Sequence, residues 1–286
     1  MVYENKNINV ANFFWGGDLT NYEISNFLSF KEKGFDVNIW SYEKLDLPDG
    51  INLRDASQII ERNLLNKFKQ NFQKSNMSSF SNLFRYELIK QQQGWWFDSD
   101  CICIESVDKF VELASDEPFI LGLENSNLVG SSVMYVNDLM INQALLDEIN
   151  LKIKNNNYNF YWGEIGPYLI TQVFKNLNIF ESVKDKKLFF SIEPENFNLL
   201  FEKKSYHSVV NKLEGSFVCH TWNEMFRKFD INKTYTPPEG SYIYKHNLKF
   251  TTQSTNYTYG KLFNLRFNPI LKYLYKLSSR LKTFGR

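Results

Sequence analysis

The N-terminal segment constrains the fold most, because it predicts a strand, a helix and a second strand within about forty residues. Residues 8–15 are dominated by β-branched and aromatic side chains, which are typical of a strand, and two glycines follow them. We predict a helix over 20–33, ended by Gly34, and a second strand over 35–42. Such a unit implies parallel strand pairing with a right-handed crossover. The sequence therefore predicts an α/β fold.

The rest of the chain continues this alternation. Helical patterns cover 54–74 and 78–92, and Gly94 ends the second of them. We also expect strands over 95–105, 119–123, 132–136, 187–192 and 216–219, with further helices in between.

Composition limits the class of protein. The 286 residues are 43% hydrophobic and 17% aromatic, enough for one large domain or two small ones. No uninterrupted apolar run of ~18 residues occurs, so we expect no membrane-spanning helix. The three cysteines are sparse and odd in number, and no signal peptide opens the chain. These features predict a cytoplasmic protein.

Charge is divided unevenly along the chain. All 32 Asp and Glu precede Gly240, against 24 Lys and Arg, a net of −8, whereas 240–286 holds nine basic residues and no acid. We therefore predict an acidic domain over 1–240 and a basic extension over 241–286 that favours an anionic surface.

Asp98 and Asp100 are the strongest candidates for a functional site. On the predicted strand they are two residues apart, so both carboxylates would project from one face with roughly 6.5 Å between Cα atoms. Their neighbours are apolar and aromatic, and buried unpaired charge is costly. A divalent cation such as Mn²⁺ or Mg²⁺ would relieve this cost and share its other positions with a diphosphate. Asn82 and Arg85 share a face of the preceding helix, where Arg85 could bind a phosphate or sugar hydroxyl.

Simpler interpretations exist for the same residues. An Asp-X-Asp spacing arises by chance on surface strands, and Arg85 could pair with Glu87 or Asp98. His220 could form a zinc site with the adjacent Cys219, although the cysteines lack the spacing of a structural zinc knuckle.

Four blocks occur in order along the chain: Phe-Phe-Trp-Gly-Gly over 13–17, the segment 80–100 with Gly-Trp-Trp-Phe-Asp-Ser-Asp, Gly-Glu-Ile-Gly-Pro over 163–167, and His-Thr-Trp-Asn-Glu over 220–224. Together they resemble glycosyltransferase family 32 and its bacterial polysaccharide-synthesis relatives. More distantly, they resemble the glucosylating domain of the large clostridial toxins. The resemblance implies a GT-A (Rossmann-like) nucleotide-sugar transferase fold with inserted helices.

The resemblance also implies site residues. Asp100 and His220 would ligate Mn²⁺ or Mg²⁺ with help from Asp98, and Arg85 would join the two aspartates as a catalytic residue. The implied donor-binding residues are Trp15, Gly16, Asn82, Arg85, Trp96, Asp98 and Trp222. Glu164 and Gly166 would bind the acceptor.

Several of these positions have plainer alternatives. Trp15 could be a core residue, Glu164 an exposed loop acid, and Gly166 part of a turn before a helix with Pro167 in its first turn.

Two positions depart from the family pattern. Asn82 stands where Asp is usual, so a charged donor contact becomes a neutral one, and Gln93 replaces the first glycine of a pair.

The C-terminal residues 268–286 predict a basic amphipathic helix. Apolar residues recur at helical spacing on one face, while Lys272, Lys276 and Arg280 recur every four residues on another. Such a helix lies on anionic membranes, which would place the protein peripherally on the inner face of the cytoplasmic membrane. The alternative is a terminal helix docked on the domain. Nucleic acid is not expected as a partner, because the body is acidic and no recognition fold is indicated.

These observations predict a metal-dependent, retaining glycosyltransferase. It would move a sugar from a nucleotide-diphosphate sugar, a UDP-hexose by resemblance, to a glycan or lipid-linked acceptor in capsule or lipopolysaccharide synthesis. The alternatives are a metal-dependent phosphotransferase or phosphodiesterase, and a non-catalytic sugar-binding protein.

Overall fold

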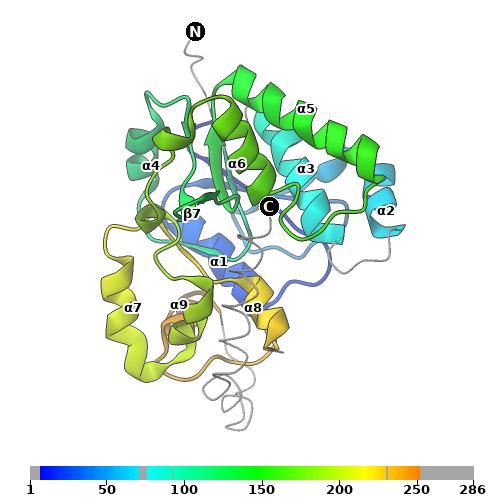
Figure 1. The fold of residues 1–286 in the computed structure, drawn as a ribbon. Coiled ribbons are helices and arrows are strands. Elements are labelled where there is room, and N and C mark those ends of the chain that lie inside the picture. The colour runs from blue at the N-terminus through cyan, green and yellow to red at the C-terminus, as the bar shows by residue number, and fades with distance from the viewer. Residues whose placement is uncertain (1–6, 71–75, 92, 230, 252–286) are drawn as a thin grey trace.

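A six-stranded sheet forms the centre of the chain, with helices packed on both of its faces (Figure 1). The computed structural model describes residues 7–70, 76–91, 93–229 and 231–251. In spatial order the strands are β3 (Asn52–Asp55), β2 (Asp36–Ser41), β1 (Val10–Phe14), β4 (Trp95–Phe97), β9 (Val133–Val136) and β6 (Phe119–Ile120). The first four are parallel, and β9 is antiparallel to both of its neighbours. This parallel-rich sheet confirms the predicted α/β fold.

The helices fill the connections between strands. They are α1 (Asn21–Glu32), α2 (Arg62–Gln70), α3 (Asn76–Lys90), α4 (Val107–Ala114), α5 (Leu139–Asn156), α6 (Pro167–Asn176), α7 (Tyr206–Leu213), α8 (Asn223–Lys228) and α9 (Tyr242–Phe250).

The N-terminal strand–helix–strand prediction is confirmed. Thr20 and Glu23 form a capping box at the start of α1, which satisfies backbone N–H groups that a helix leaves unpaired. Gly34 has φ +95°, a backbone conformation that suits glycine, and it directs the chain into β2. β1 and β2 pair in parallel, with Phe13 opposite Ile39.

Strand alternation divides the core between the two sheet faces. On β4, Trp95 and Phe97 belong to one buried cluster, in which Phe97 lies 4.4 Å from Phe30 of α1 between ring centroids. Trp96, between them, points to the opposite cluster and lies 6.3 Å from Phe84 of α3. Burying a large apolar side chain contributes roughly 1.5–3 kcal/mol, so β4 is strongly fixed on both faces.

The single strand predicted over 95–105 is wrong. The structure divides it into β4 and β5 (Cys101–Cys103), and β5 pairs with β10 (Val218–His220) in a separate two-stranded sheet. Between them the chain turns, and the Cys101 N–H donates to the Asp98 carbonyl at 3.0 Å. Asp98 and Asp100 therefore lie in a turn at the carboxyl end of β4, not on one strand face.

Two other predicted elements differ. The helical segment 54–74 begins instead with the end of β3, whose Arg54 pairs in register with Trp40 of β2. Residues 187–192 form no strand, and a 3-10 helix spans Lys186–Leu188. In both places long-range packing decides a locally ambiguous pattern.

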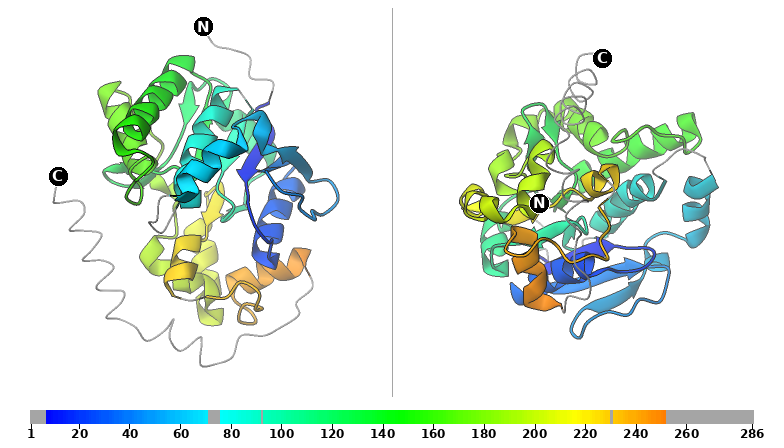
Figure 2. Two further views of the ribbon diagram at one scale, coloured as in Figure 1. Left: turned by 90° about the vertical axis from the view of Figure 1, so that its right-hand side faces the viewer. Right: turned by 90° about the horizontal axis from the view of Figure 1, so that it is seen from below.

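Helix α9 lies beside α1 (Figure 2), although its residues fall in the predicted C-terminal extension. Ile243 is buried in the same core cluster as the sheet, and Lys249 donates to Glu32 of α1 at 2.6 Å. The predicted amphipathic helix over 268–286 lies outside the described residues.

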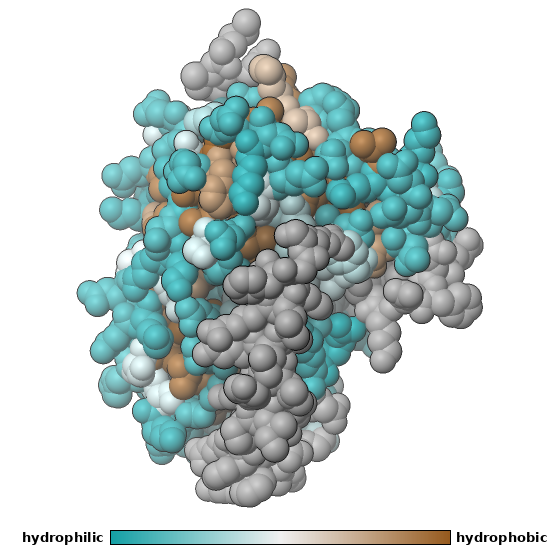
Figure 3. Space-filling view, viewed as in Figure 1, coloured by the Kyte–Doolittle hydropathy of each residue, from teal (hydrophilic) through white to brown (hydrophobic). Residues whose placement is uncertain are grey.

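Hydrophilic residues cover most of the described surface on the face drawn in Figure 3, and hydrophobic residues form separate patches there. Scattered apolar side chains are ordinary on a protein surface. Within 7–251, excluding the gaps, no helix has both the length and the apolarity that a membrane span requires.

Candidate functional site

A cavity of about 660 Å³ opens where β4 ends, between α3 and the segment that follows β10. All the residues that the sequence predicted to bind the donor or the metal line this cavity. These are Trp15, Gly16, Asn82, Arg85, Trp96, Asp98, Asp100, His220 and Trp222. From the block 163–167, Gly163 and Pro167 also line it. Segments far apart in the sequence thus share one cavity.

Asp100 directly precedes β5, and its side chain lies beside that of His220, the last residue of β10. His220 Nε2 lies 3.2 Å from Asp100 Oδ1, and the backbone N–H of Asn223 donates to Oδ2 at 2.8 Å. The Thr221 N–H and hydroxyl donate to the Asp100 backbone carbonyl at 2.8 and 2.9 Å. The turn that carries Asp100 is therefore tied to the segment after β10 at several points.

The two groups shift each other's pKa. Burial favours the neutral carboxyl, but His220 and the Asn223 N–H outweigh it and hold the pKa of Asp100 below its usual value. Burial likewise opposes the imidazolium, yet the neighbouring Asp100 carboxylate raises the pKa of His220. Each group therefore favours the charged form of the other.

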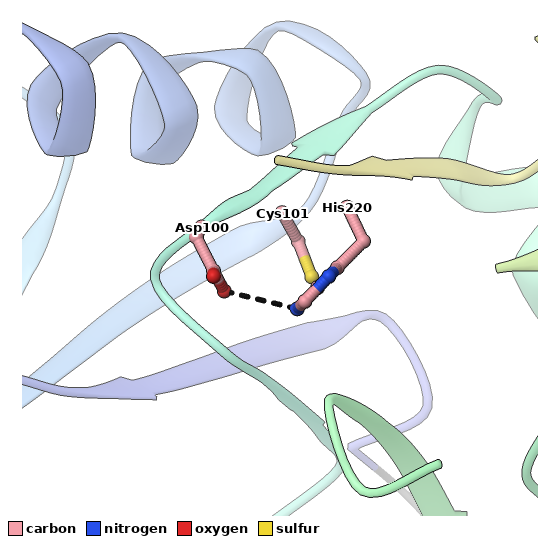
Figure 4. Close-up of side chains that lie close together, drawn as sticks. All are labelled: Asp100, Cys101 and His220. Atoms are coloured by element: carbon pink, nitrogen blue, oxygen red, sulfur yellow. Dashed lines mark ion pairs between the residues drawn. The ribbon is translucent and has the colours of Figure 1, made fainter. Parts of the chain in front are cut away.

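Asp100, Cys101 and His220 form the group that could hold a metal ion, with one ligand atom from each lying within 4.8 Å of the others (Figure 4). A carboxylate and an imidazole nitrogen suit Mn²⁺, and the Asn223 N–H orients the carboxylate as outer-shell partners do. Burial and the two nearby aspartates raise the pKa of the Cys101 thiol well above its usual value, so this thiol is a poor ligand. Asp100 and His220 therefore fit the implied metal.

Asp98 has different partners. Its Oδ1 lies 3.0 Å from Arg85 Nη2 and accepts a hydrogen bond from Trp96 Nε1 at 2.9 Å. The Arg85 guanidinium also lies 4.9 Å from the Trp96 ring centroid. The interpretation of Arg85 as a partner of Asp98 is thus correct, and the pair lies in the wall of the cavity.

Further hydrogen bonds fix Arg85. It donates to the Ser131 carbonyl, to the Ser81 hydroxyl at 3.1 Å and to the Ser81 carbonyl at 3.3 Å. Its side chain is only 4% exposed. A guanidinium held this way keeps a fixed positive charge at the cavity, which suits an anionic ligand.

Asn82 connects the cavity to the Gly-Glu-Ile-Gly-Pro block. A Cβ on Gly166 would lie 2.8 Å from Asn82 Oδ1, so only glycine allows this approach. Pro167 is the first residue of α6, as predicted. Glu164 is buried and accepts hydrogen bonds from Asn156 at 2.9 Å and from the Tyr161 N–H at 3.2 Å. Neither Gly166 nor Glu164 is among the described residues that line the cavity.

The two predicted tryptophans line the cavity with their indole N–H groups already engaged. Trp15 Nε1 donates to the Gly17 carbonyl at 3.0 Å, and Trp222 Nε1 donates to the Ile192 carbonyl at 2.7 Å. Trp222 also packs edge-on against His220, with ring centroids 4.2 Å apart. Both rings therefore offer surface rather than a free donor.

Several cavity residues were missed from the sequence, among them Glu124, Ser131 and Trp162. Burial raises the pKa of Glu124 to about 7, since this exceeds the opposing effect of His220. Glu124 lies on β7 (Leu123–Asn125), which pairs with β8 (Leu128–Val129). In the sequence, Glu124 is an acidic residue that follows an apolar segment, and apolar neighbours were also part of the argument for Asp98.

Residues 151–246 match a family model described as the alpha 1,4-glycosyltransferase conserved region. The match covers the blocks with Gly166 and His220 and begins after Asp100. Over these residues the chain is similar to alpha 1,4-glycosyltransferases, enzymes that transfer a sugar.

No curated protein sequence matches the chain. Among solved structures, the PaToxG glycosyltransferase is similar at 12% identity and a TM-score of 0.44, over 90% of this chain and 83% of that one. The bifunctional glycosyltransferase WbbM is similar at 13% identity and a TM-score of 0.47, over 93% of this chain and 51% of that one.

Proposed function

We propose that the whole chain is a family 32-like glycosyltransferase that takes its sugar from a nucleotide-diphosphate sugar, a UDP-hexose by family resemblance, and depends on Mn²⁺ or Mg²⁺. One observation carries the proposal: Asp100 and His220 face each other in the same cavity that holds the Asp98–Arg85 pair. A metal-binding pair beside a fixed guanidinium suits a ligand with both a diphosphate and sugar hydroxyls.

The proposed metal site consists of Asp100 and His220. When bound, the ion would neutralise charge on the departing diphosphate. Asp98 is held by Arg85 and Trp96, so it would accept hydrogen bonds from donor-sugar or ribose hydroxyls rather than serve as a main metal ligand. This refines the role of Asp98 within the predicted set.

Arg85 would act on the leaving group or the donor sugar. Its hydrogen bonds to Ser81 and Ser131 orient the guanidinium before substrate binds, so little reorganisation is needed as charge develops. Asn82 would contribute a neutral hydrogen bond to the sugar, while the rings of Trp15 and Trp222 would pack on the nucleotide and around the diphosphate.

The proposed reaction retains the anomeric configuration. The acceptor hydroxyl oxygen forms a bond to the anomeric carbon on the face from which the diphosphate leaves, and its proton passes to the departing phosphate oxygen. No protein nucleophile is required in this scheme. Glu164 and Gly166, the predicted acceptor residues, would act by shaping the wall beside Asn82.

The metal-dependent phosphotransferase alternative is less well supported. In the described ranges, the candidate metal group contains a single carboxylate, that of Asp100, whereas such enzymes need several.

Capsule or lipopolysaccharide synthesis is the proposed setting, with the basic segment 268–286 bringing the enzyme to lipid-linked acceptors at the inner membrane face. The support is the sequence pattern of that segment alone. Co-sedimentation with anionic liposomes tests it: binding should fall when residues 261–286 are deleted, and unchanged binding contradicts it.

Donor turnover tests the enzymatic proposal. The purified protein is incubated with UDP-, GDP- and CMP-sugars, with and without Mn²⁺, and release of nucleotide is measured. We expect turnover of at least one donor that requires the metal and is lost in Asp100→Asn. Asp116→Asn, at an exposed site outside the cavity, is the matched control and should keep it. Absence of metal-dependent turnover with every donor contradicts the proposal.

A further inference from the structure

Glu124 is a cavity carboxylate that has no part in the proposed donor and metal contacts and, among the described residues, no protein partner. Asp98 is paired with Arg85, and Asp100 is paired with His220. Glu224, which also lines the cavity, is paired with Arg227 at 2.6 Å. Among the residues that the structure describes, none donates a hydrogen bond or forms an ion pair to Glu124.

Backbone hydrogen bonds fix the strand that carries Glu124, whereas its side-chain carboxyl group has no protein partner among the described residues. Strand β7 pairs with β8, and Leu123 N–H donates to the Lys184 carbonyl at 2.9 Å. On the β8 side, the Val129 N–H donates to the Thr171 hydroxyl of α6 at 2.9 Å. The side chain is partly buried and lines the same cavity as Asp100 and His220. A paired hairpin therefore presents to the cavity a carboxyl group that has no protein partner among the described residues.

The acidic character of Glu124 limits which part of the donor or acceptor it can bind. In its charged form Glu124 repels a diphosphate, so it is unsuited to the nucleotide end of a donor. It is also outside the group of Asp100, Cys101 and His220 that could hold a metal. A neutral ligand that donates hydrogen bonds, such as a sugar hydroxyl, satisfies the buried carboxylate without introducing like charge.

Donor-sugar hydroxyls already have proposed partners in Asp98, Asn82 and Arg85, all from α3 and the turn after β4. Glu124 comes from a separate hairpin and has no role in the proposed donor contacts, so it can bind the acceptor sugar. We propose that Glu124 accepts a hydrogen bond from a hydroxyl of the acceptor sugar and orients that sugar for attack. This inference rests on the proposed glycosyl transfer and adds an acceptor contact to it.

The test compares transfer with hydrolysis. UDP-glucose and UDP-galactose are supplied with Mn²⁺, first without acceptor to measure hydrolysis and then with a set of methyl glycosides to measure transfer. In Glu124→Gln, which keeps the size of the side chain and removes its charge, the ratio of transfer to hydrolysis should fall about ten- to hundredfold, as expected for a hydrogen bond to a charged group. The KM for the acceptor should rise with it.

The control is Glu195→Gln. Glu195 is close enough to act on the charge of Glu124 but does not line the cavity, so the ratio should stay at the wild-type value. An unchanged ratio in Glu124→Gln overturns the inference while donor turnover by the wild type upholds the proposed function. An equal fall in both reactions also overturns it, because the carboxylate would then serve the donor. A wild type that turns over none of the UDP-, GDP- and CMP-sugars overturns both.

Discussion

The ion pair between Arg85 and Asp98 should contribute measurably to the free energy of unfolding. Breaking a buried ion pair by removing one partner costs about 3–5 kcal/mol. Arg85 is 4% exposed and Asp98 27% exposed, so solvent weakens the effect on one side. We therefore expect Arg85→Met to lower the free energy of unfolding by about 2–4 kcal/mol, including its lost bonds to Ser81 and Ser131.

Asp98→Asn should cost less, about 1 kcal/mol, because the amide keeps its size and its oxygen still accepts from Trp96. The double variant should be less damaged than the sum of the two, because no unpaired charge remains. The predicted coupling free energy is about 1–2 kcal/mol.

Urea unfolding of the wild type, both single variants and the double variant measures this coupling. The reasoning is refuted if the two single effects add to within about 0.5 kcal/mol, since distant independent sites behave in that way. Arg62→Met is a suitable control, because its contact with Glu43 is exposed and 3.7 Å long and should contribute well under 1 kcal/mol.

Three other perturbations follow from the geometry. Gly166→Ala places a Cβ 2.8 Å from Asn82 Oδ1, so the KM for donor should rise several-fold in steady-state assays while the unfolding midpoint changes little. Gly94→Ala combines φ +96° with a Cβ that clashes with the Asn7 carbonyl oxygen, and it should lose more than about 2 kcal/mol in urea unfolding. Gly215→Ala, at φ +75° with nothing within 4 Å of the new Cβ, should lose only about 1 kcal/mol. Because the pKa of His220 is raised and a metal needs its neutral imidazole, calorimetric Mn²⁺ affinity should fall about tenfold per pH unit below that pKa and level off above it.

Each of these has a contradicting result. An unchanged donor KM in Gly166→Ala separates Asn82 from donor binding. If Gly94→Ala and Gly215→Ala lower the free energy of unfolding equally, backbone strain alone, and not the contact with Asn7, determines the loss. A Mn²⁺ affinity that does not depend on pH removes His220 from the ligand set, because Asp100 is already ionised in that range.

Local patterns predicted the elements in which neighbours in sequence are neighbours in space. The first strand, its capped helix and the second strand follow from alternation, a capping box and a glycine. The Asp98–Asp100 turn did not follow, because the apolar residues on both sides equally suit one long strand. Only the pairing of Cys101 with the distant His220 shows where that strand breaks.

The candidate site was predictable where residue types recur in an ordered motif, as with Asp98, Asp100, Arg85 and His220. Glu124 was not, because a single acid in a short strand carries no spacing signal, and its significance depends on which cavity its hairpin faces. The segment 187–192 failed for a related reason. Its apolar residues pack in the core, which a pattern predicts, but their backbone finds no partner strand among the described residues.

The central claim is that Asp100 and His220 hold a metal that binds the diphosphate of the donor. Calorimetric titration of UDP into the wild type and Asp100→Asn, each with and without Mn²⁺, tests it most directly. We predict that Mn²⁺ tightens UDP binding at least about tenfold in the wild type and has no effect on binding to Asp100→Asn. Equal binding of UDP in all four titrations would contradict the claim.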